Sequence, residues 1–302
     1  MKTLFFGTSA FAVPSLETAA QRTDLQGVVT QPDRPAGRGQ KLTAPPVKVA
    51  AQRLGIPVYQ PASLREFPGV LQGQHFDFFI LASYGKLIPQ SLLDVPKLGS
   101  LNVHPSLLPQ YRGATPIQSA LRDGASETGV TIMLMDAGLD TGDIVLQERT
   151  PILPGEIYGE LHDRLARFGA QALMHAIDAA RGGAFPHSPQ HGKATTTRPL
   201  RKEDFAIDWN WEARRIVDHV RSLSPSPAAR AVIAGTPVKI LRAEIAQWER
   251  PLVAPGTIAS MIGDGLGVQS GKGVVNVLEV IAPNRGAQTG ASFGAQFLRA
   301  GT

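Results

Sequence analysis

Short apolar runs alternate with helical stretches from Leu4 to Met135, and this alternation constrains the fold more than any other feature of the sequence. Phe76–Ala82 and Leu101–His104 are two such runs, and Val47–Leu54 is an intervening stretch with helical character. Short buried strands separated by helices are typical of a doubly wound, mostly parallel sheet. We therefore expect an α/β fold, in which ligands bind beyond the carboxyl ends of the strands.

The second half of the chain changes character twice. Glu156–Arg181 has the apolar spacing of a long amphipathic helix, and the stretch that follows is rich in Pro, Gly, Thr and basic residues, which predicts an extended linker. Beyond Ala231, short strands separated by glycines predict a small antiparallel β-barrel of the OB type. The sequence thus divides into a first domain at 1–188, a linker at 189–206 and a barrel domain at 207–302.

Composition excludes several kinds of chemistry. The chain has no cysteine, so disulfides, thiolate zinc sites and a cysteine nucleophile are excluded. Its net charge of +5 permits a polyanionic partner. It has no apolar run long enough for a membrane helix and no secretory signal at Met1, so we expect a cytoplasmic protein without membrane contact. Nothing in it requires more than a monomer.

The common nucleotide and metal motifs are missing. Gly37-Arg38-Gly39 lacks the third glycine of a dinucleotide fingerprint, and no Walker, GxSxG or HExxH pattern occurs. Asp136, Asp140 and Asp143 lie close together, but they lack the spacing and the terminal Glu of a calcium loop. We expect no metal.

Asn102, His104 and Asp140 form the one set of residues with coherent chemistry. Asn102 and His104 are two apart near the end of a strand, so they share a face, and Asp140 follows the next strand along the chain. If the two strands are neighbours, the three side chains converge. An amide, an imidazole and a carboxylate suit a reaction in which a carbonyl oxygen gains charge and an amine loses a proton. Taken singly, each has a structural alternative: a turn residue, a half-buried histidine, and an Asp that shapes a glycine-rich turn.

Four segments carry a resemblance to a known family, and together they extend over the whole chain. The segment 101–113, LNVHPSLLPQYRG, and the segment 135–143, MDAGLDTGD, are similar to the two signatures of the formyltetrahydrofolate-dependent formyltransferases. TQPDRPAGRG at 30–39 and IDW at 207–209 extend the similarity. Within the family, the chain most resembles the members that formylate methionyl initiator tRNA.

The resemblance implies that a formyl group passes from 10-formyltetrahydrofolate to the α-amino group of methionyl initiator tRNA through a tetrahedral intermediate. By this resemblance, Asn102 hydrogen-bonds the formyl oxygen, and His104 stabilises the oxyanion as an imidazolium. Asp140 holds His104 in that state and accepts the amine's proton, directly or through water. The folate co-substrate is expected to bind at four residues: Ser106, Leu107, Leu108 and Pro109.

A basic segment, Arg34–Lys41, follows the second predicted strand and contains three cations and no acid. Because glycines allow close approach to phosphates and cations neutralise them, and because tRNA-acting relatives carry this loop, we expect Arg34, Arg38 and Lys41 to contact the acceptor arm. A solvated loop is the alternative. Further cations in the linker and the barrel domain could extend the surface, whereas Gln110 replaces a basic residue of many relatives.

Two other functions remain open from the sequence. One is a relative that formylates an amino sugar or nucleotide, or that hydrolyses formyltetrahydrofolate. The other is a nucleic-acid-binding protein without catalysis, in which Asn102, His104 and Asp140 would be incidental.

Overall fold

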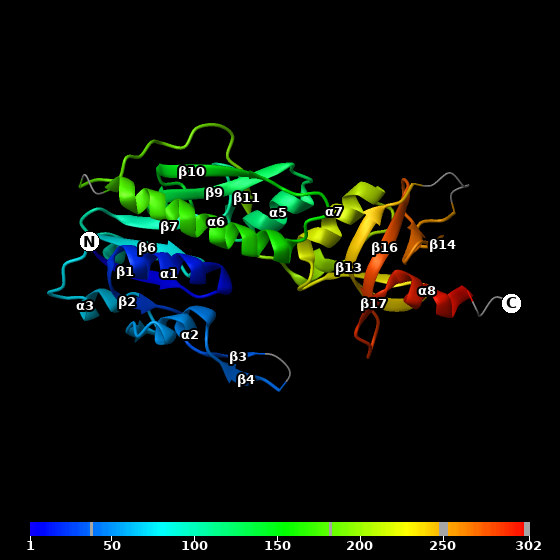
Figure 1. Cartoon of the computed structure of the whole chain (residues 1–302), viewed down its shortest axis with the longest axis horizontal. Coiled ribbons are helices and arrows are strands. Elements are labelled where there is room, and N and C mark those ends of the chain that lie inside the picture. Colours follow the sequence, from blue (N-terminus) through cyan, green and yellow to red (C-terminus); the bar gives the residue numbers. More distant parts are fainter. Residues whose placement is uncertain (37–38, 181–182, 248–252, 299–302) are drawn as a thin grey trace. The chain divides into compact units, whose positions relative to one another are not determined.

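The structure is a computed structural model that describes residues 1–36, 39–180, 183–247 and 253–298 (Figure 1). The chain forms two compact units. Unit 1 comprises residues 1–116, 127–151 and 162–197, and unit 2 comprises residues 117–126, 152–161 and 198–302. Two short stretches that the sequence-based division placed in the first domain, 117–126 and 152–161, thus belong to unit 2.

Unit 1 is built on a seven-stranded sheet with the order β10-β9-β7-β6-β1-β2-β5. The five strands from β7 to β5 are parallel, whereas β9 is antiparallel to β7 and β10 is antiparallel to β9. The mostly parallel sheet predicted from the sequence is therefore confirmed. The strands are β1 (Lys2–Gly7), β2 (Asp24–Val29), β5 (Val58–Tyr59), β6 (Phe78–Ala82), β7 (Ser100–His104), β9 (Glu127–Leu134) and β10 (Ile144–Pro151).

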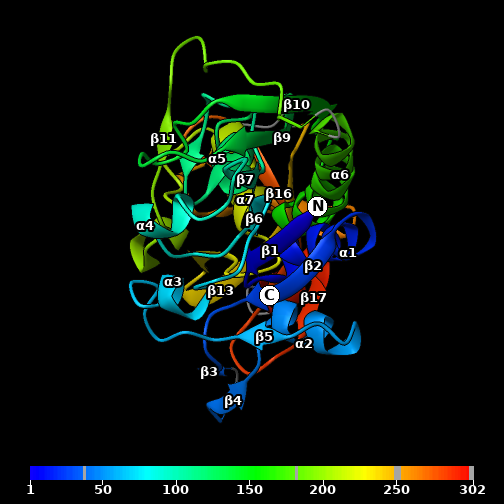
Figure 2. The ribbon, with the colours of Figure 1, turned by 90° about the vertical axis from the view of Figure 1, so that its left-hand side faces the viewer.

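Helices cover both faces of this sheet, and Figure 2 shows α1 and α6 on one face and α3 and α4 on the other. The strands alternate accordingly: Phe6 packs among aromatic rings beside α3, with its ring centroid 6.5 Å from that of Phe67 and 5.8 Å from that of Tyr84. The helices of unit 1 are η1 (Ala10–Ala12), α1 (Val13–Arg22), α2 (Pro46–Arg53), α3 (Phe67–Val70), α4 (Gln90–Leu93) and most of α6 (Tyr158–Ala179), whereas α5 (Pro116–Arg122) lies almost entirely in unit 2.

Strand β10 was not predicted. Its residues, IVLQERTP, are mostly half-buried because the strand lies at an edge of the sheet, so they form no apolar run of the kind that marks the central strands. The hairpin of β9 and β10 closes the side of the sheet next to β7, and the loop between them carries Asp140.

Two small strand pairs complete unit 1. β3 (Arg34–Ala36) and β4 (Lys41–Thr43) form an antiparallel ribbon, and β8 (Arg112–Gly113) pairs in parallel with β11 (Thr196–Thr197). β11 lies inside the segment that was predicted to be an extended linker at 189–206. That segment also contains the 3-10 helix η3 (Lys202–Phe205), so it is a structured part of the chain.

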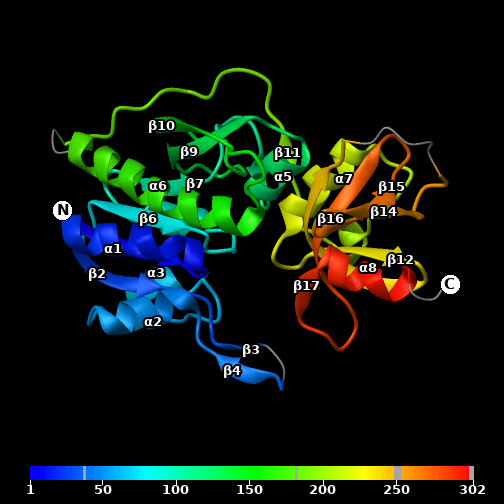
Figure 3. The ribbon, with the colours of Figure 1, turned by 45° about the vertical axis from the view of Figure 1, so that its right-hand side comes forward.

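Unit 2 has the antiparallel strand domain that the sequence predicts. Its sheet has the order β12-β13-β16-β15-β14, with β17 paired to β16, and α7 and α8 pack on it (Figure 3). Helix α8 was not predicted, because Gly290 and Gly294 interrupt its apolar pattern. The elements are α7 (Ala213–Leu223), β12 (Ala229–Ile233), β13 (Thr236–Ile245), β14 (Ile258–Ile262), β15 (Gly265–Gln269), β16 (Val274–Ile281), β17 (Ala287–Thr289) and α8 (Gly290–Leu298).

No helix within the described ranges combines the length and the apolarity that crossing a membrane requires.

Candidate active site

Asn102 and His104 share one face of β7 because side chains alternate along a strand. Val103, between them, faces α6: a Cβ added at Gly169 of that helix would lie 2.8 Å from Val103 Cγ1. The close approach of α6 therefore occupies one side of β7 and leaves Asn102 and His104 on the opposite face. The predicted sharing of a face is confirmed.

Asp140 joins these two side chains. Its Oδ1 lies 3.5 Å from Asn102 Nδ2, and its Oδ2 lies 3.6 Å from His104 Nδ1. The backbone N–H of Gly113 also donates to Asp140 Oδ2, at 2.7 Å. The structure thus brings the three predicted residues together, with Asn102 and His104 next to the carboxylate of Asp140.

The route by which Asp140 reaches the site corrects part of the sequence argument. The two strands are neighbours, but β9 is antiparallel to β7, so Leu134 at the end of β9 pairs with Leu101 near the start of β7. The carboxyl end of β9 therefore lies beside the amino end of β7, on the side of the sheet away from His104. Asp140 arrives because the loop 135–143 folds back over the face of β7, with Asp140 itself in the left-handed region at a φ of 51°.

His104 is a buried imidazole, with 4% of its surface exposed. Burial lowers its pKa below the ordinary value, and this effect outweighs the nearby Asp140 carboxylate and the Tyr111 carbonyl, both of which raise it. Without substrate the ring is therefore neutral at pH 7. Nε2 lies 3.0 Å from the Tyr111 carbonyl oxygen, which can only accept, so Nε2 carries the hydrogen.

The neutral state of the His104 ring differs from the charged state that the family resemblance implies. The resemblance implies an imidazolium, whereas the Nδ1 lone pair of the neutral tautomer faces Asp140. A second proton on His104 would therefore have to arrive during the reaction, and Asp140 Oδ2 is placed to stabilise the resulting charge.

The four residues expected at the folate site differ in exposure. Ser106 and Leu108 are buried and hydrogen-bonded within the protein: Thr131 Oγ1 donates to the Ser106 carbonyl at 2.7 Å, and the Leu108 N–H donates to Thr131 Oγ1 at 3.2 Å. Leu107 and Pro109 keep part of their surface exposed. This pattern leaves Leu107 and Pro109 as the accessible members of the set.

The basic segment expected to contact tRNA is a ribbon rather than a loop. Arg34 on β3 and Lys41 on β4 are both exposed, and Figure 3 shows the ribbon extending from the body of unit 1. Arg38 lies outside the described residues. Leu42, beside Lys41, is 71% exposed, so the ribbon presents an apolar side chain among its cations.

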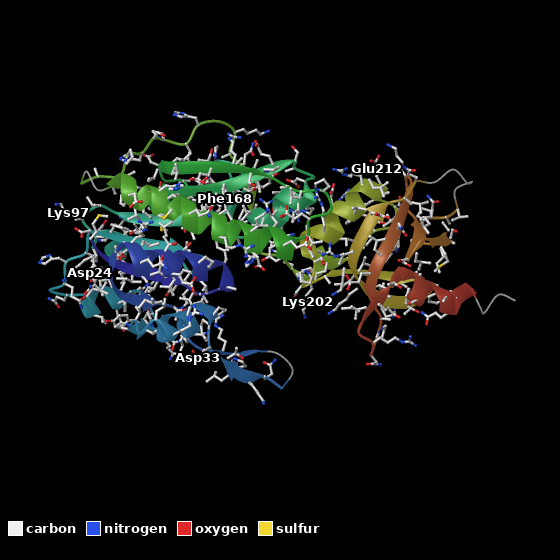
Figure 4. The ribbon with its side chains drawn as sticks, in the orientation of Figure 1. Asp24, Asp33, Lys97, Phe168, Lys202 and Glu212 are labelled. Carbon is white, nitrogen blue, oxygen red and sulfur yellow. The ribbon has the colours of Figure 1, made fainter. Side chains whose placement is uncertain are left out.

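The base of the ribbon is fixed by Asp33, which Figure 4 labels. Lys48 Nζ donates to both Asp33 oxygens at 2.8 Å, and Gln60 Nε2 donates to Oδ1 at 2.8 Å. These two donors, with Lys48 also contributing its charge, lower the pKa of Asp33. The anion is therefore held in the body of unit 1, at the point where the ribbon begins.

Among the linker cations, Arg198 is paired within the protein. Its guanidinium binds Asp204 through two contacts of 2.6 Å, and this pairing lowers the pKa of Asp204. Lys193 is exposed. The positive surface suggested for the linker is thus partly neutralised at Arg198.

The described residues contain no group of three or more His, Cys, Asp or Glu side chains arranged to hold a metal ion. Asp136, in the loop 135–143, instead accepts from Thr141 Oγ1 at 2.7 Å and from the Gly138 N–H at 3.0 Å. It shapes the turn that presents Asp140.

Sequence reasoning missed Gln190 and Thr195. Gln190 Nε2 donates to the Asp140 carbonyl at 2.9 Å, and Thr195 Oγ1 accepts from the Tyr111 N–H at 2.8 Å. Both residues lie in a stretch rich in Pro, Gly and Thr, which carries no periodic signal and was interpreted as linker. Only the fold reveals that this stretch touches the site.

Comparison with known proteins identifies the family. Residues 1–177 match the family described as "Formyl transferase", and residues 199–298 match "Formyl transferase, C-terminal domain". The chain is 45% identical to the methionyl-tRNA formyltransferase of Syntrophus aciditrophicus over 286 residues, which cover 93% of this chain and 91% of that protein. It is 42% identical to the enzyme of the same name from Pelotomaculum thermopropionicum, over 93% of this chain and 90% of the other.

Solved structures share the fold at low sequence identity. An N-formyltransferase from Helicobacter canadensis in complex with folinic acid and dTDP-3-aminofucose has a TM-score of 0.69 at 18% identity, over 93% of this chain and 98% of that one. HypX from Aquifex aeolicus in complex with tetrahydrofolic acid has a TM-score of 0.66 at 15% identity, over 99% of this chain and 48% of the other. The extent and identity of the sequence matches place this chain in the formyltransferase family, among the methionyl-tRNA formyltransferases.

Proposed function

We propose that this protein transfers the formyl group of 10-formyltetrahydrofolate to the α-amino group of methionyl initiator tRNA. The observation that carries the proposal is the contact of Asn102 and His104 with the Asp140 carboxylate. It is made in a chain that aligns over 93% of its length with relatives named methionyl-tRNA formyltransferase. The names of the relatives support the choice of substrates, and the geometry of the site supports the proposed chemistry.

The reaction begins when the free amine attacks the formyl carbon of the co-substrate. A new C–N bond forms, and the carbonyl oxygen of the formyl group becomes an oxyanion in a tetrahedral intermediate. Asn102, a partly exposed residue on the face of β7, donates a hydrogen bond from Nδ2 to that oxygen. A single donor of this kind contributes about 2.7–4 kcal/mol to lowering the barrier.

The His104–Asp140 pair handles the proton that the attacking amine loses. The ring begins neutral because its burial lowers its pKa, and Asp140 begins as the nearby base. The proton passes to this pair, directly or through water, and the imidazolium formed on His104 stabilises the oxyanion. General base catalysis of this type contributes about 10²–10⁴-fold. The intermediate collapses by re-forming the C=O bond and breaking the bond between the formyl carbon and N10. N10 takes the proton back from the His104–Asp140 pair, directly or through water, and leaves as tetrahydrofolate.

We place the folate co-substrate against the Ser106–Pro109 segment, with Leu107 and Pro109 supplying the accessible apolar surface. We place the acceptor arm of the tRNA against the basic segment, where Arg34 and Lys41 are exposed and where Arg38 lies between them in the sequence. Both placements are expectations from the family resemblance. No feature of the mechanism requires a second copy of the chain, and we expect a monomer that acts in the cytoplasm.

An amino-sugar acceptor is the second candidate, because solved structures with this fold include a formyltransferase bound to dTDP-3-aminofucose. At 18% identity that likeness concerns the fold alone, whereas the relatives at 42–45% identity are named for methionyl-tRNA. The tRNA acceptor is therefore the better supported one.

A direct assay tests the proposal. The protein is incubated with 10-formyltetrahydrofolate and one of three acceptors: methionyl initiator tRNA, the same tRNA uncharged, or a nucleotide-linked amino sugar. Formyl-methionyl product from the charged tRNA alone is the expected result. Formylation of the amino sugar in preference to the charged tRNA would favour the second candidate.

A further inference from the structure

Gln190 joins the two loops that carry the candidate active site. Its Nε2 donates to the carbonyl oxygens of Asp140, at 2.9 Å, and Gly142, at 2.8 Å. Its Oε1 accepts from Arg112 through both Nε, at 3.1 Å, and Nη2, at 2.7 Å. One side chain thus binds the loop of Asp140 with its donors and the loop after β7 with its acceptor.

The chain around Gln190 reinforces this connection, and we call residues 188–197 the strap. At its start, Ser188 and Ile144 exchange two backbone hydrogen bonds of 2.8 and 2.9 Å. At its end, the Arg112 N–H donates to the Thr195 carbonyl at 2.9 Å, and Thr197 Oγ1 donates to the Arg112 carbonyl at 3.0 Å. Both ends of the strap are therefore hydrogen-bonded to the rest of unit 1.

The strap also holds the two backbone groups that touch the catalytic side chains. Tyr111, whose carbonyl oxygen contacts His104 Nε2, donates its N–H to Thr195 Oγ1 at 2.8 Å. Gly113, whose N–H donates to Asp140, pairs with Thr197 across β8 and β11. The partners of both His104 and Asp140 thus depend on contacts with the strap.

The loops need such outside support because their backbones are strained. Tyr111 has a φ of 58° and Asp140 a φ of 51°, and non-glycine residues adopt this left-handed region at a cost of about 1–2 kcal/mol each. Such conformations persist only where surrounding contacts determine them. For Asp140, the side-chain amide of Gln190 supplies one of those contacts directly.

We propose that Gln190 is a positioning residue for formyl transfer: by bridging Asp140, Gly142 and Arg112, it fixes the Asp140 carboxylate against His104 and Asn102. The inference rests on the function proposed above. It also makes the strap a part of the catalytic machinery rather than a tether between domains. Because small misplacements of reacting groups cost about 100-fold in rate, loosening this bridge lowers turnover without removing any group that touches substrate.

Two substitutions separate the contacts that Gln190 makes. Gln190→Met removes all of them at similar side-chain length. Gln190→Glu keeps an acceptor for Arg112 but removes both hydrogen bonds donated to the Asp140 loop. Gln52→Met, at an exposed position on α2, is the matched control.

Each variant is measured in two ways. Steady-state kinetics with 10-formyltetrahydrofolate and methionyl initiator tRNA gives kcat and KM. Hydrogen–deuterium exchange of peptides covering 109–115 and 135–143 reports the order of the two loops and needs no activity. We expect both Gln190 variants to lose about 100-fold in kcat with little change in either KM. Gln190→Met should exchange faster in both peptides, whereas Gln190→Glu should exchange faster mainly in 135–143, because it keeps an acceptor for Arg112. The Gln52 variant should match the unaltered protein.

Wild-type kcat in the Gln190 variants would overturn the inference, as would a fall in kcat with no change of exchange in the two peptides. Inactivity of the unaltered protein toward methionyl-tRNA would instead contradict the proposed function. In that case, faster exchange in the variants would still support the structural role of the bridge, and unchanged exchange would refute it.

Discussion

Gly113 donates its backbone N–H to Asp140 Oδ2 at 2.7 Å, which makes the orientation of the candidate base depend on a glycine. Gly113 has a φ of 103°, a conformation that other residues adopt only under strain. A Cβ at this position would lie 2.3 Å from the carbonyl oxygen of Thr197. The turn, the strap and the Asp140 carboxylate are thus packed around a site with no room for a side chain.

Gly113→Ala should therefore lower both stability and turnover. Gly73→Ala is a matched control outside the strap, because Gly73 has a φ of 78° but its added Cβ would meet no atom within 4 Å. The control should lose about 1–2 kcal/mol of unfolding free energy from backbone strain alone, with kcat unchanged. Gly113→Ala should lose more, and its kcat should fall. Urea unfolding and formylation kinetics check this, and equal effects of the two changes would contradict it.

Asp140→Asn should abolish most of the activity while leaving the fold in place, because the amide oxygen of Asn can still accept from Gly113. Without the carboxylate, residue 140 can neither take a proton nor stabilise an imidazolium on His104. The expected loss in kcat is about 10²–10⁴-fold. Asp143→Asn, which changes a carboxylate of the same loop paired with His187, is the control and should retain its turnover. Equal kcat values for the two variants would show that Asp140 has no special role.

The sequence predicted the site better than it predicted the path by which the chain builds it. Asn102 and His104 were recognised as a pair because the period of a strand is local and needs no knowledge of the fold. The signature also identifies Asp140, but it does not indicate that β9 runs antiparallel to β7 or that the loop 135–143 folds back to reach the site. Strand direction depends on pairing between distant segments, and the apolar run of β9 looks the same whether it runs parallel or antiparallel to β7.

What the sequence did not reveal lacks a periodic signal. β10 is a half-buried edge strand, and its charged residues interrupt the apolar run by which the central strands are recognised. The strap looks like a linker because its contacts are hydrogen bonds from Gln190, Thr195 and Thr197, which leave no pattern of apolar spacing. The basic segment was expected to be a loop because three-residue strands such as β3 and β4 are too short to predict.

The stability of the protein should fall as the pH falls from about 6.5 to 4, in part because of His219. This histidine is buried, and its pKa is lowered to about 4. Burial is the main cause and the charges of Arg122 and Arg215 add to it, while the Phe205 carbonyl and Asp204 oppose the shift. Between pH 4 and 6.5 the unfolded chain binds the proton and the folded protein does not. The stabilisation is therefore fully present above pH 6.5 and lost on acidification, by at most about 3 kcal/mol.

Urea unfolding between pH 4 and 7 measures this contribution by comparison with His219→Gln. The variant has no imidazole to titrate, so its unfolding free energy should decline less over the range, by up to about 3 kcal/mol. His191→Gln removes an exposed imidazole and should follow the unaltered protein. A His219→Gln curve parallel to that of the unaltered protein would show that His219 does not carry the effect.

The basic segment should contribute affinity for tRNA rather than chemistry. Replacing Arg38 and Lys41 together with Ala should weaken binding of methionyl-tRNA. It should also make the plot of log affinity against log salt less steep by about two units, one for each cation removed from the phosphate backbone. Lys97→Ala, at an exposed position elsewhere in unit 1, is the control. Filter-binding titrations at several salt concentrations measure both quantities. Unchanged affinity and slope in the double variant would remove the segment from the interface.

The most direct test of the account is a single-turnover measurement with His104→Ala. In separate reactions, the variant or the unaltered protein, in excess over methionyl initiator tRNA, is mixed with that tRNA and 10-formyltetrahydrofolate. The formyl-methionyl product is then followed in time. We predict that the unaltered protein formylates the tRNA. The variant should bind tRNA with similar affinity but form product slower by two or more orders of magnitude, roughly the loss expected for removing an oxyanion donor. Product formation by His104→Ala at the rate of the unaltered protein would contradict the account.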